Sequence, residues 1–143
     1  MKITVIFDKE REEEVLIYAR ERTALIDSIE QLVTEDSVSL IGYSDREAVP
    51  LDLDDICFFT VEANKVFAVT DSEKFQLKHR LYKIEEQLPK RFVKINQSCI
   101  ANIKKIKRFD ASVSGTLTVI FQNGDRDFVS RRNLKNVNER LGL

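Results

Sequence analysis

The segment GTLTVIFQNGDRDFVS, residues 115–130, constrains the fold of this chain more than any other stretch. Leu117, Val119 and Phe121 alternate along it and share one face, which is typical of a strand with one buried side. Asn123-Gly124 predicts a tight hairpin turn built from two residues with positive φ. RDFVS (126–130) is then the returning strand, so the sequence predicts antiparallel sheet here.

Short apolar segments between turn residues extend this strand pattern upstream. A three-stranded meander is expected over ICFFTVEA (56–63), KVFAVTD (65–71) and EKFQLK (73–78). Two short helices are also expected. The first carries the helix-spaced Leu81, Ile84 and Leu88 and ends at Pro89, and the second begins after Ser130 as N-cap.

The N-terminal part predicts a separate small module. Strand-like KITVIFD (2–8) and EVLIYAR (14–20) precede a helical stripe between residues 23 and 35, and VSLIGY (38–43) returns to strand character. This ββαβ module, residues 1–45, is too small to be stable on its own. We therefore expect it to pack on the rest of the chain or on a second copy. The polar, acidic segment 44–55, broken by Pro50, is the expected seam before a second domain, residues 46–143.

RFVKINQSCIANIKKIKRF, residues 91–109, is ambiguous by composition alone. Phe92, Ile95, Cys99, Ile103 and Ile106 have helical spacing, which favours an amphipathic basic helix. The central Asn96-Gln97-Ser98 favours a turn, and the β-branched residues favour strands. Composition and spacing alone therefore leave both the helix and the pair of strands possible.

Charge is strongly segregated along the chain despite a net charge of -1. Residues 1–73 carry 7 Lys/Arg and 18 Asp/Glu, whereas residues 74–108 carry 11 Lys/Arg and 2 Asp/Glu. If the basic block folds onto one face, it would suit a polyanion, although a solvated face balanced by the acidic half is an equal alternative.

The sequence offers little to an enzyme. His79 has no evident nucleophile or metal partner, and neither GxGxxG nor GxxxxGK[ST] occurs. Asp52, Asp54 and Asp55 match no cation loop, so no catalytic residue, metal or cofactor is expected. Cys57 and Cys99 are expected to be buried free thiols, and no signal peptide or membrane span is evident, so we expect a cytoplasmic protein.

Three predicted tips combine bases with amides: Asn64-Lys65, Asn96-Gln97-Ser98 and Ser130-Arg131-Arg132-Asn133. Lys and Arg suit phosphates, whereas Asn, Gln and Arg suit base edges. For each tip taken alone, ordinary turn or cap chemistry is the favoured explanation.

Three longer segments together resemble the LytTR family of bacterial DNA-binding domains: DDICFFTVEANKVFAV (54–69), LYKIEEQLPKRFVKINQSCIANIKKI (81–106) and NGDRDFVSRRNLKNV (123–137). The resemblance implies a mostly β (α+β) fold, an elongated stack of small antiparallel sheets with short helices, here preceded by the ββαβ module. It also implies two strands around a polar tip in residues 92–101, not a long helix. The whole chain looks like the small stand-alone regulators without a receiver domain.

The resemblance further implies that loop residues read bases in successive major grooves of bent double-stranded DNA. Base-contact candidates are Asn64, Lys65, Asn96, Gln97, Arg131 and Arg132, with the choice between the two arginines open. Asn96 stands where a histidine is frequent in the family. Phosphate candidates are Lys78, Arg80, Lys90, Arg91, Lys94, Ser98, Lys104, Lys105, Lys107 and Ser130.

The expected function is therefore sequence-specific transcriptional regulation. A homodimer on repeated sites is expected, with the N-terminal module as the dimer surface, and an inhibitory membrane-protein partner is a family expectation. The alternatives are a non-enzymatic protein-interaction module and an RNA-binding module. Exposed aromatic residues on a sheet would favour RNA.

Overall fold

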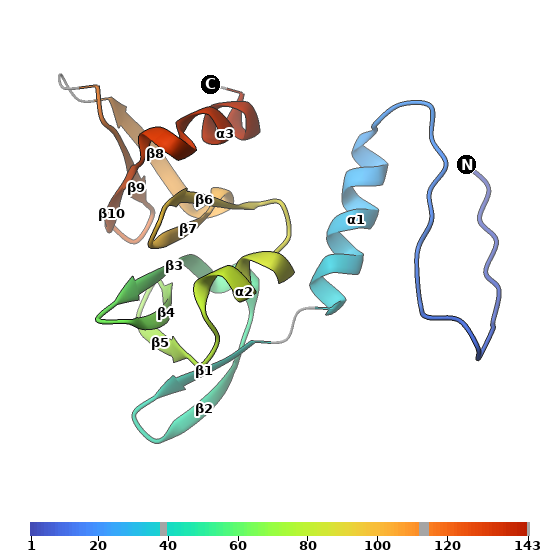
Figure 1. Cartoon of the computed structure of the whole chain (residues 1–143), viewed down its shortest axis with the longest axis horizontal. Helices are drawn as coiled ribbons and strands as arrows, with labels where there is room; N and C mark the ends of the chain where they lie inside the picture. The colour runs from blue at the N-terminus through green and yellow to red at the C-terminus, as the bar shows by residue number, and fades with distance from the viewer. Residues whose placement is uncertain (38–39, 112–114, 143) are drawn as a thin grey trace.

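The computed structural model describes residues 1–37, 40–111 and 115–142, and Figure 1 shows an antiparallel β domain with an N-terminal helix and arm to one side. Two sheets account for all the strands in the described part of the chain. The strands are β1 (Leu40–Ser44), β2 (Glu47–Leu51), β3 (Ile56–Glu62), β4 (Lys65–Thr70), β5 (Lys74–Leu77), β6 (Phe92–Asn96), β7 (Cys99–Asn102), β8 (Ile106–Ala111), β9 (Leu117–Phe121) and β10 (Arg126–Val129). The helices are α1 (Ala24–Ser37), α2 (Leu81–Gln87) and α3 (Arg131–Leu141), with short 3-10 turns at Leu53–Asp55 and Ile103–Lys105.

The larger sheet has seven strands in the order β2-β1-β5-β4-β3-β7-β6, and the smaller has three in the order β10-β9-β8. Every neighbouring pair in both sheets is antiparallel. Figure 1 shows the smaller sheet and α3 next to the β6–β7 end of the larger sheet, where α3 and β10 contact β6. The expectation of a mostly β fold with short helices is confirmed.

The interior position of strand β3, between β4 and β7, explains why ICFF is apolar at every position. Ile56 and Phe59 belong to one core with α2 residues Leu81 and Ile84, whereas Cys57 and Phe58 belong to a second core with the smaller sheet and α3. A register shift between Ile56 and Phe58 accompanies this change of face. A strand covered on both sides needs a continuous apolar run rather than alternation.

Residues 92–102 form β6 and β7 around the polar tip, so the basic helix left open by periodicity is excluded. Strand pairing decides against helix, because β7 has a hydrogen-bonded neighbour on each side, β3 and β6. Val93, Ile95, Cys99 and Ala101 enter the second core.

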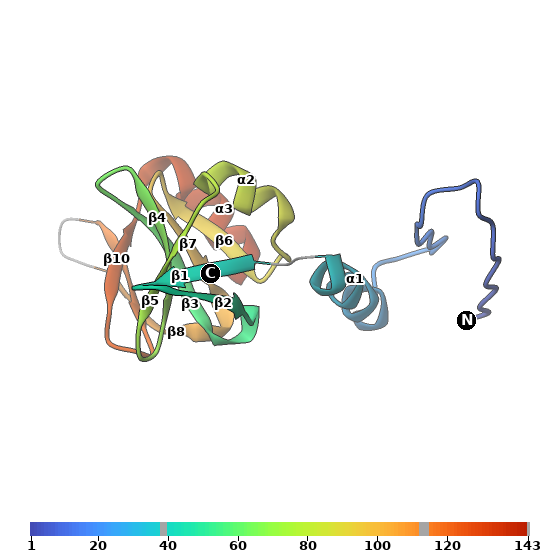
Figure 2. The same ribbon diagram turned by 90° about the horizontal axis from the view of Figure 1, so that it is seen from below.

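The predicted ββαβ module differs from the structure in two ways. Residues 2–8 and 14–20 form no hydrogen-bonded strand, and residues 1–23 run out and back on the far side of α1 (Figures 1 and 2). They have strand-like sequences, but none of the described strands pairs with them. The last expected strand, β1, joins the main sheet between β2 and β5, where Leu40 is buried. The predicted boundary at residue 45 therefore falls inside the β1–β2 turn.

Two local details complete the fold. Gly42 in β1 lies so close to β5 that an added Cβ would come within 2.5 Å of the Phe75 Cβ. In the β9–β10 turn only Gly124 has positive φ, so the prediction that Asn123 shares this conformation is wrong. The Phe121 N–H donates to the Asp125 carbonyl, and the Gly124 N–H donates to the Phe121 carbonyl, a longer turn than the two-residue form.

Candidate nucleic-acid interface

Two of the predicted tips share a hollow of about 690 Å³ on the domain surface. The turn between β6 and β7, strand β10 and the start of α3 supply most of its walls, and the end of β3 supplies the rest. Figures 1 and 2 place the β3–β4 turn, the β6–β7 turn and the start of α3 along the side of the domain that faces away from α1. Its lining residues are Thr60, Val61, Lys94, Asn96, Gln97, Ser98, Asp127, Phe128, Ser130, Arg132 and Asn133.

Asn96 forms the floor of this hollow. Its side chain is buried, and the Nδ2 group donates to Asp127 Oδ1 at 2.9 Å and to the Phe128 carbonyl at 2.8 Å. The Oδ1 atom accepts from the Ser98 N–H at 2.9 Å. Asn96 therefore ties the β6–β7 turn to β10, and its amide is occupied inside the protein, so it is a poor candidate for a base contact.

Gln97 and Ser98 form the exposed tip of the same turn. The Ser98 carbonyl accepts from the Val61 N–H at 3.0 Å, which joins the tip to the end of β3. Gln97 is thus presented outward by a turn that is anchored on both sides. Lys94, half-buried on β6, lines the hollow next to it.

The start of α3 is fixed from the same turn. Ser130 is the N-cap residue, as predicted, but it makes no side-chain cap bond. Its N–H donates to the Ile95 carbonyl at 2.8 Å, and its Oγ accepts from Asn133 Nδ2 at 2.7 Å. Ser130 is half-buried and bonded within the protein, which makes its predicted phosphate contact less accessible.

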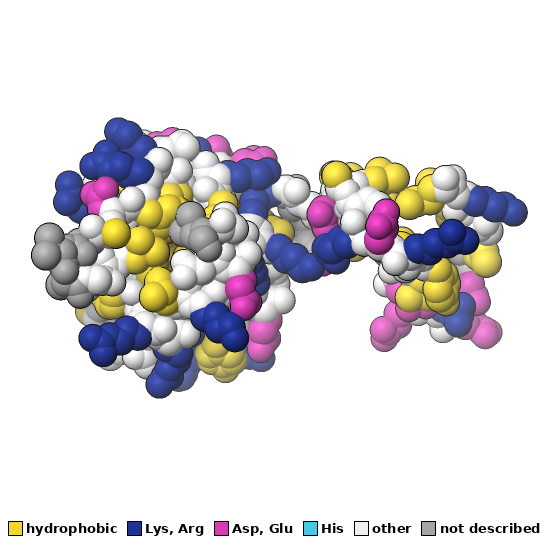
Figure 3. Space-filling view, turned by 90° about the horizontal axis from the view of Figure 1, so that it is seen from above, with side chains coloured by type: hydrophobic (Ala, Val, Ile, Leu, Met, Phe, Trp, Pro, Cys, Tyr) yellow, Lys and Arg dark blue, Asp and Glu magenta, His cyan; other side chains and the backbone are white. Residues whose placement is uncertain are grey.

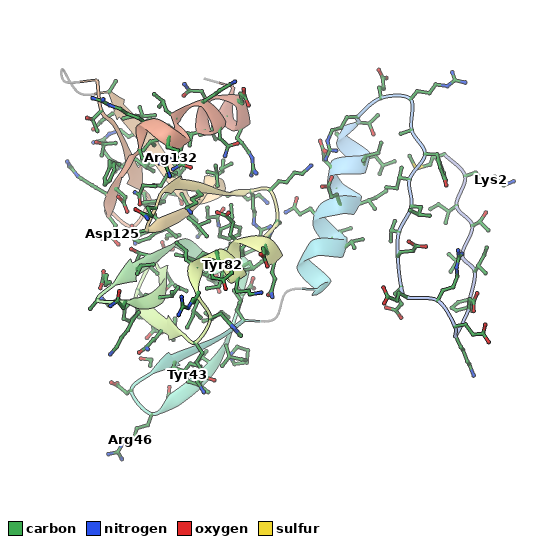
Figure 4. The ribbon with its side chains drawn as sticks, in the orientation of Figure 1. Lys2, Tyr43, Arg46, Tyr82, Asp125 and Arg132 are labelled. Atoms are coloured by element: carbon green, nitrogen blue, oxygen red, sulfur yellow. The ribbon has the colours of Figure 1, made fainter. Side chains whose placement is uncertain are left out.

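Arg131 and Arg132 are both exposed, but they lie on different surfaces. Arg132 lines the hollow with Gln97, whereas Arg131 lines a separate depression with Leu134 and Lys135 along α3. Figure 4 shows Arg132 between α3 and the β6–β7 turn. The structure thus brings Arg132, and not Arg131, together with Gln97.

The third tip adjoins the hollow through β3. Ala63 and Asn64 both have positive φ and form the two-residue turn between Glu62 and the paired Lys65. Asn64 and Lys65 are exposed, and the turn begins directly after Val61, which lines the hollow. The three predicted tips therefore form one continuous polar edge.

The comparisons with known proteins cover the residues of this edge. The family described as the LytTr DNA-binding domain matches residues 46–142. The chain belongs to the LytTR family. LytTR domains are a class of DNA-binding domains and not an enzyme class, so the chain carries a DNA-binding domain.

Relatives and a solved structure extend the match. An uncharacterised HTH-type transcriptional regulator of Staphylococcus aureus strain MSSA476 is 33% identical over 146 residues, covering 100% of this chain and 99% of the relative. Its counterpart from strain NCTC 8325 / PS 47 is 32% identical with the same coverage. The structure is also similar to a LytTr DNA-binding domain from Bacillus cereus, with a TM-score of 0.69 and 21% identity over 73% of this chain and 97% of that chain.

The basic residues of the LytTR domain do not form one continuous face. Arg91 is turned inward, with its Nη2 3.0 Å from Asp54 Oδ1 and 7% of its side chain exposed. Lys105 Nζ lies 3.7 Å from Asp71 Oδ2, and Lys90 Nζ lies 3.0 Å from Glu30 Oε1. These three phosphate candidates are engaged with carboxylates. The other exposed candidates are Lys78, Arg80, Ser98, Lys104 and Lys107, of which Lys78 also covers the Tyr43 ring at 4.6 Å.

Phe128 is a residue of the hollow that the sequence predictions missed. It is 51% exposed although its neighbour Val129 is buried. Alternation along β10 holds the signal, because a strand that buries Val129 must turn Phe128 to the outer face. An apolar ring at this edge could contact the methyl group of a thymine.

The cysteines lie outside this edge and are free thiols, both buried. Burial raises the pKa of Cys57 to about 12, and its Sγ donates to Asp71 Oδ1 at 3.3 Å. Burial likewise raises the pKa of Cys99, helped by Asp127. Among the described residues, no cluster of His, Cys, Asp and Glu could hold a metal, and no helix there is long and apolar enough to cross a membrane.

Proposed function

We propose that this protein is a sequence-specific regulator that reads double-stranded DNA through its major grooves. Membership of a DNA-binding family supports the partner, and the joint placement of Gln97 and Arg132 in one hollow supports the mode. Arg addresses the O6 and N7 of guanine, and Gln addresses the N6 and N7 of adenine. Those are the two side chains on this edge best suited to bidentate base contacts.

The proposed roles divide among the residues of the edge. Gln97 and Arg132 read bases, with Asn64 and Lys65 reading at a neighbouring groove. Lys94 and Ser98 contact phosphates beside them. Asn96 and Ser130 hold the readers in place through their bonds to β10, Ile95 and Asn133. This division explains why polar residues of similar type, Asn96 and Gln97, stand side by side in the sequence.

The N-terminal part fits the same proposal. Residues 1–37 carry 5 Lys/Arg and 10 Asp/Glu, and this arm and α1 lie on the far side of the domain from the reading edge (Figure 1). An acidic segment on that side stays clear of the duplex and repels polyanions that approach there. Two copies are proposed to bind repeated sites.

An RNA-binding module is the less favoured alternative. Single-strand recognition on a sheet uses two or three exposed aromatic rings. Phe58, Phe59, Phe92 and Phe121 are buried, and Phe128 is the exposed ring of the hollow. A single exposed ring offers little surface for the stacking of RNA bases, so recognition of duplex DNA is favoured.

Selection from random duplex DNA tests the proposal. The wild-type protein should yield a motif, and Gln97→Ala and Arg132→Ala should each lose information at particular positions, because each removes about 1 to 3 kcal/mol of discrimination. Arg131→Ala is the matched control on the neighbouring surface and should keep the motif. Lys94→Ala should weaken all sequences alike and reduce the salt slope by about one.

Three results would overturn the proposal. One is recovery of no motif, and another is a motif that Arg131→Ala changes more than Arg132→Ala. The third is equal retention of single-stranded RNA. A protein-interaction module would also lack the steep linear dependence of duplex affinity on salt in a log-log plot.

A further inference from the structure

The first 33 residues carry most of the exposed apolar side chains. Among the side chains that the structure describes, 15 large hydrophobic residues are exposed, and 12 of these precede residue 34. Phe7 is 95% exposed and Tyr18 is 94% exposed. In Figure 3 this part projects from the domain with apolar side chains over much of its surface. A concentration of this kind marks an interaction site.

The charges of the arm, residues 1–22, are arranged by position. Residues 3–7 (ITVIF) and 15–19 (VLIYA) carry no charge at all. Between them the tip, residues 8–14 (DKEREEE), holds two bases and five acids. At the other end Lys2, Arg20 and Arg22 outnumber Glu21, so the base of the arm is positive. Figure 1 shows the tip and the base at opposite ends of the arm, and Figure 4 shows Lys2 pointing away from the domain.

The arm is strand-like in sequence, but its backbone is not paired in a sheet. Its two apolar segments have strand-forming sequences, and the turn between them is started by Asp8, whose Oδ1 accepts from the Glu10 N–H at 3.0 Å. Yet residues 1–23 contain no hydrogen-bonded strand. A lone two-stranded hairpin is marginal in water, whereas a sheet of more strands with a covered apolar face is stable.

We propose that the arm pairs with the arm of a second copy of this chain, antiparallel about a two-fold axis. In that arrangement the acidic tip of each arm lies against the positively charged base of the other arm, where Lys2, Arg20 and Arg22 lie. The uncharged segments of the two arms meet in the middle. A two-fold interface must be self-complementary in this way. A parallel arrangement would place tip against tip and repel.

Helix α1 supplies the cover for the resulting sheet. Leu25, Ile29, Leu32 and Val33 follow the spacing of one helical face, and all but the half-buried Ile29 are exposed. Arg22 pairs with Asp27 and Glu30, which fixes the junction between arm and helix. The dimer would therefore have a small core of its own, made from two arms and two helices.

The available area matches what a dimer needs. A large apolar side chain offers on the order of 100 Å² of apolar surface. Twelve of them give on the order of 1,000 Å² per copy, compared with about 800 Å² per partner in a standard interface. The arm of a second copy offers the same apolar area, and it presents a positive end to the acidic tip and an acidic end to the positive base. The charged domain of the same chain does not offer this match.

Sedimentation of the full chain without DNA tests this inference separately from DNA reading. The wild-type protein should dimerise at micromolar concentrations. The double variant Val5→Asp with Ile17→Asp should be monomeric, whereas the control Tyr82→Asp, at an exposed position on α2, should still dimerise. Neither arm residue enters either core, so the thermal unfolding of the domain should be kept.

Charge reversal tests the antiparallel arrangement. Reversing the base (Lys2→Glu, Arg20→Glu) or the tip (Glu12→Lys, Glu13→Lys) should each weaken dimerisation roughly tenfold, because like charges then meet. Both reversals in one chain should restore it, and the two singly reversed proteins should bind each other. A wild-type monomer throughout the micromolar range, a dimer that survives Val5→Asp with Ile17→Asp, or reversals without effect would overturn the inference.

Discussion

The domain and the N-terminal arm are built from similar sequences with opposite outcomes. ICFFTVE in β3 has its first four side chains buried, whereas ITVIF in the arm has every large apolar side chain exposed. Both are short, apolar and rich in β-branched and aromatic residues. The difference is that β3 has a neighbour on each side, β4 and β7, and the arm has none among the residues that the structure describes. Strand propensity produces a strand only where a partner edge and a covering surface exist.

Truncation of a phenylalanine in each region should give the largest contrast. Phe59→Ala, at a fully buried position, should lower the free energy of unfolding by about 3 to 5 kcal/mol. Phe7→Ala should change it by less than about 0.5 kcal/mol, because the ring contacts mainly water in the single chain. Urea denaturation at protein concentrations below self-association measures both. Equal losses would mean that the arm packs on its own domain.

A second contrast lies between adjacent residues of the β6–β7 turn. Asn96→Ala should destabilise the domain by about 1 to 3 kcal/mol, because Asp127, the Phe128 carbonyl and the Ser98 N–H lose their partner. Gln97→Ala, at an exposed position, should stay within about 0.5 kcal/mol of the wild type. Thermal unfolding of the two variants checks this. If the two variants lost equal stability, the turn would not be anchored through Asn96.

Thiol reactivity distinguishes the closed domain from the open arm. At pH 8 Cys57 and Cys99 should react with a thiol reagent only after denaturation, because both are buried and their pKa values are raised. Tyr18→Cys should react at once in the native protein. The Cys57 pKa of about 12 lies above the ordinary value of 9.0, so its stabilising contribution is full below pH 9 and declines as pH rises toward 12. Fast native labelling of Cys57 would contradict the packing of β3.

The smallest effect is expected at the ion pair between α1 and the domain. Lys90 and Arg22 both donate to Glu30 and lower its pKa below the ordinary value of 4.5. Any stabilisation is therefore present above that value and lost as pH falls through the lowered pKa. Because the groups are exposed, Glu30→Gln should shift the melting temperature at neutral pH by no more than the error of the measurement. A clear shift would show that α1 is held firmly against the domain.

Local patterns predicted most of the domain, because its strands alternate or run apolar in ways that only sheets accommodate. Residues 91–109 needed the family resemblance, since helical spacing and strand composition conflict there. Pairing between β7 and β3, distant in sequence, decides that conflict, and no local window contains it. The prediction failed at the two N-terminal segments for the converse reason: their local pattern is strand-like, but no strand in the described part of the chain pairs with them.

The site could be predicted as three tips but not as individual roles. Asn96 and Gln97 are both polar residues at the end of a strand, and burial of the first depends on Asp127 and Phe128, about thirty residues later. Arg131 and Arg132 differ by one step at a helix start, and only the packed position of α3 assigns Arg132 to the hollow. Alternation along β10 places Phe128 and Val129 on opposite faces. Only the burial of Val129 shows that Phe128 is the exposed one of the two.

The bonds of Asn96 have a consequence for how such a regulator changes its targets. Asn96 makes the hydrogen bonds that anchor the β6–β7 turn. Its exposed neighbour Gln97 is therefore not needed to hold the turn in place. If Gln97 reads a base as proposed, a replacement at residue 97 should alter the preferred operator in one step without the loss of stability that usually accompanies a new specificity. Regulators with duplicated genes could diverge at this position while the frame that presents it stays the same.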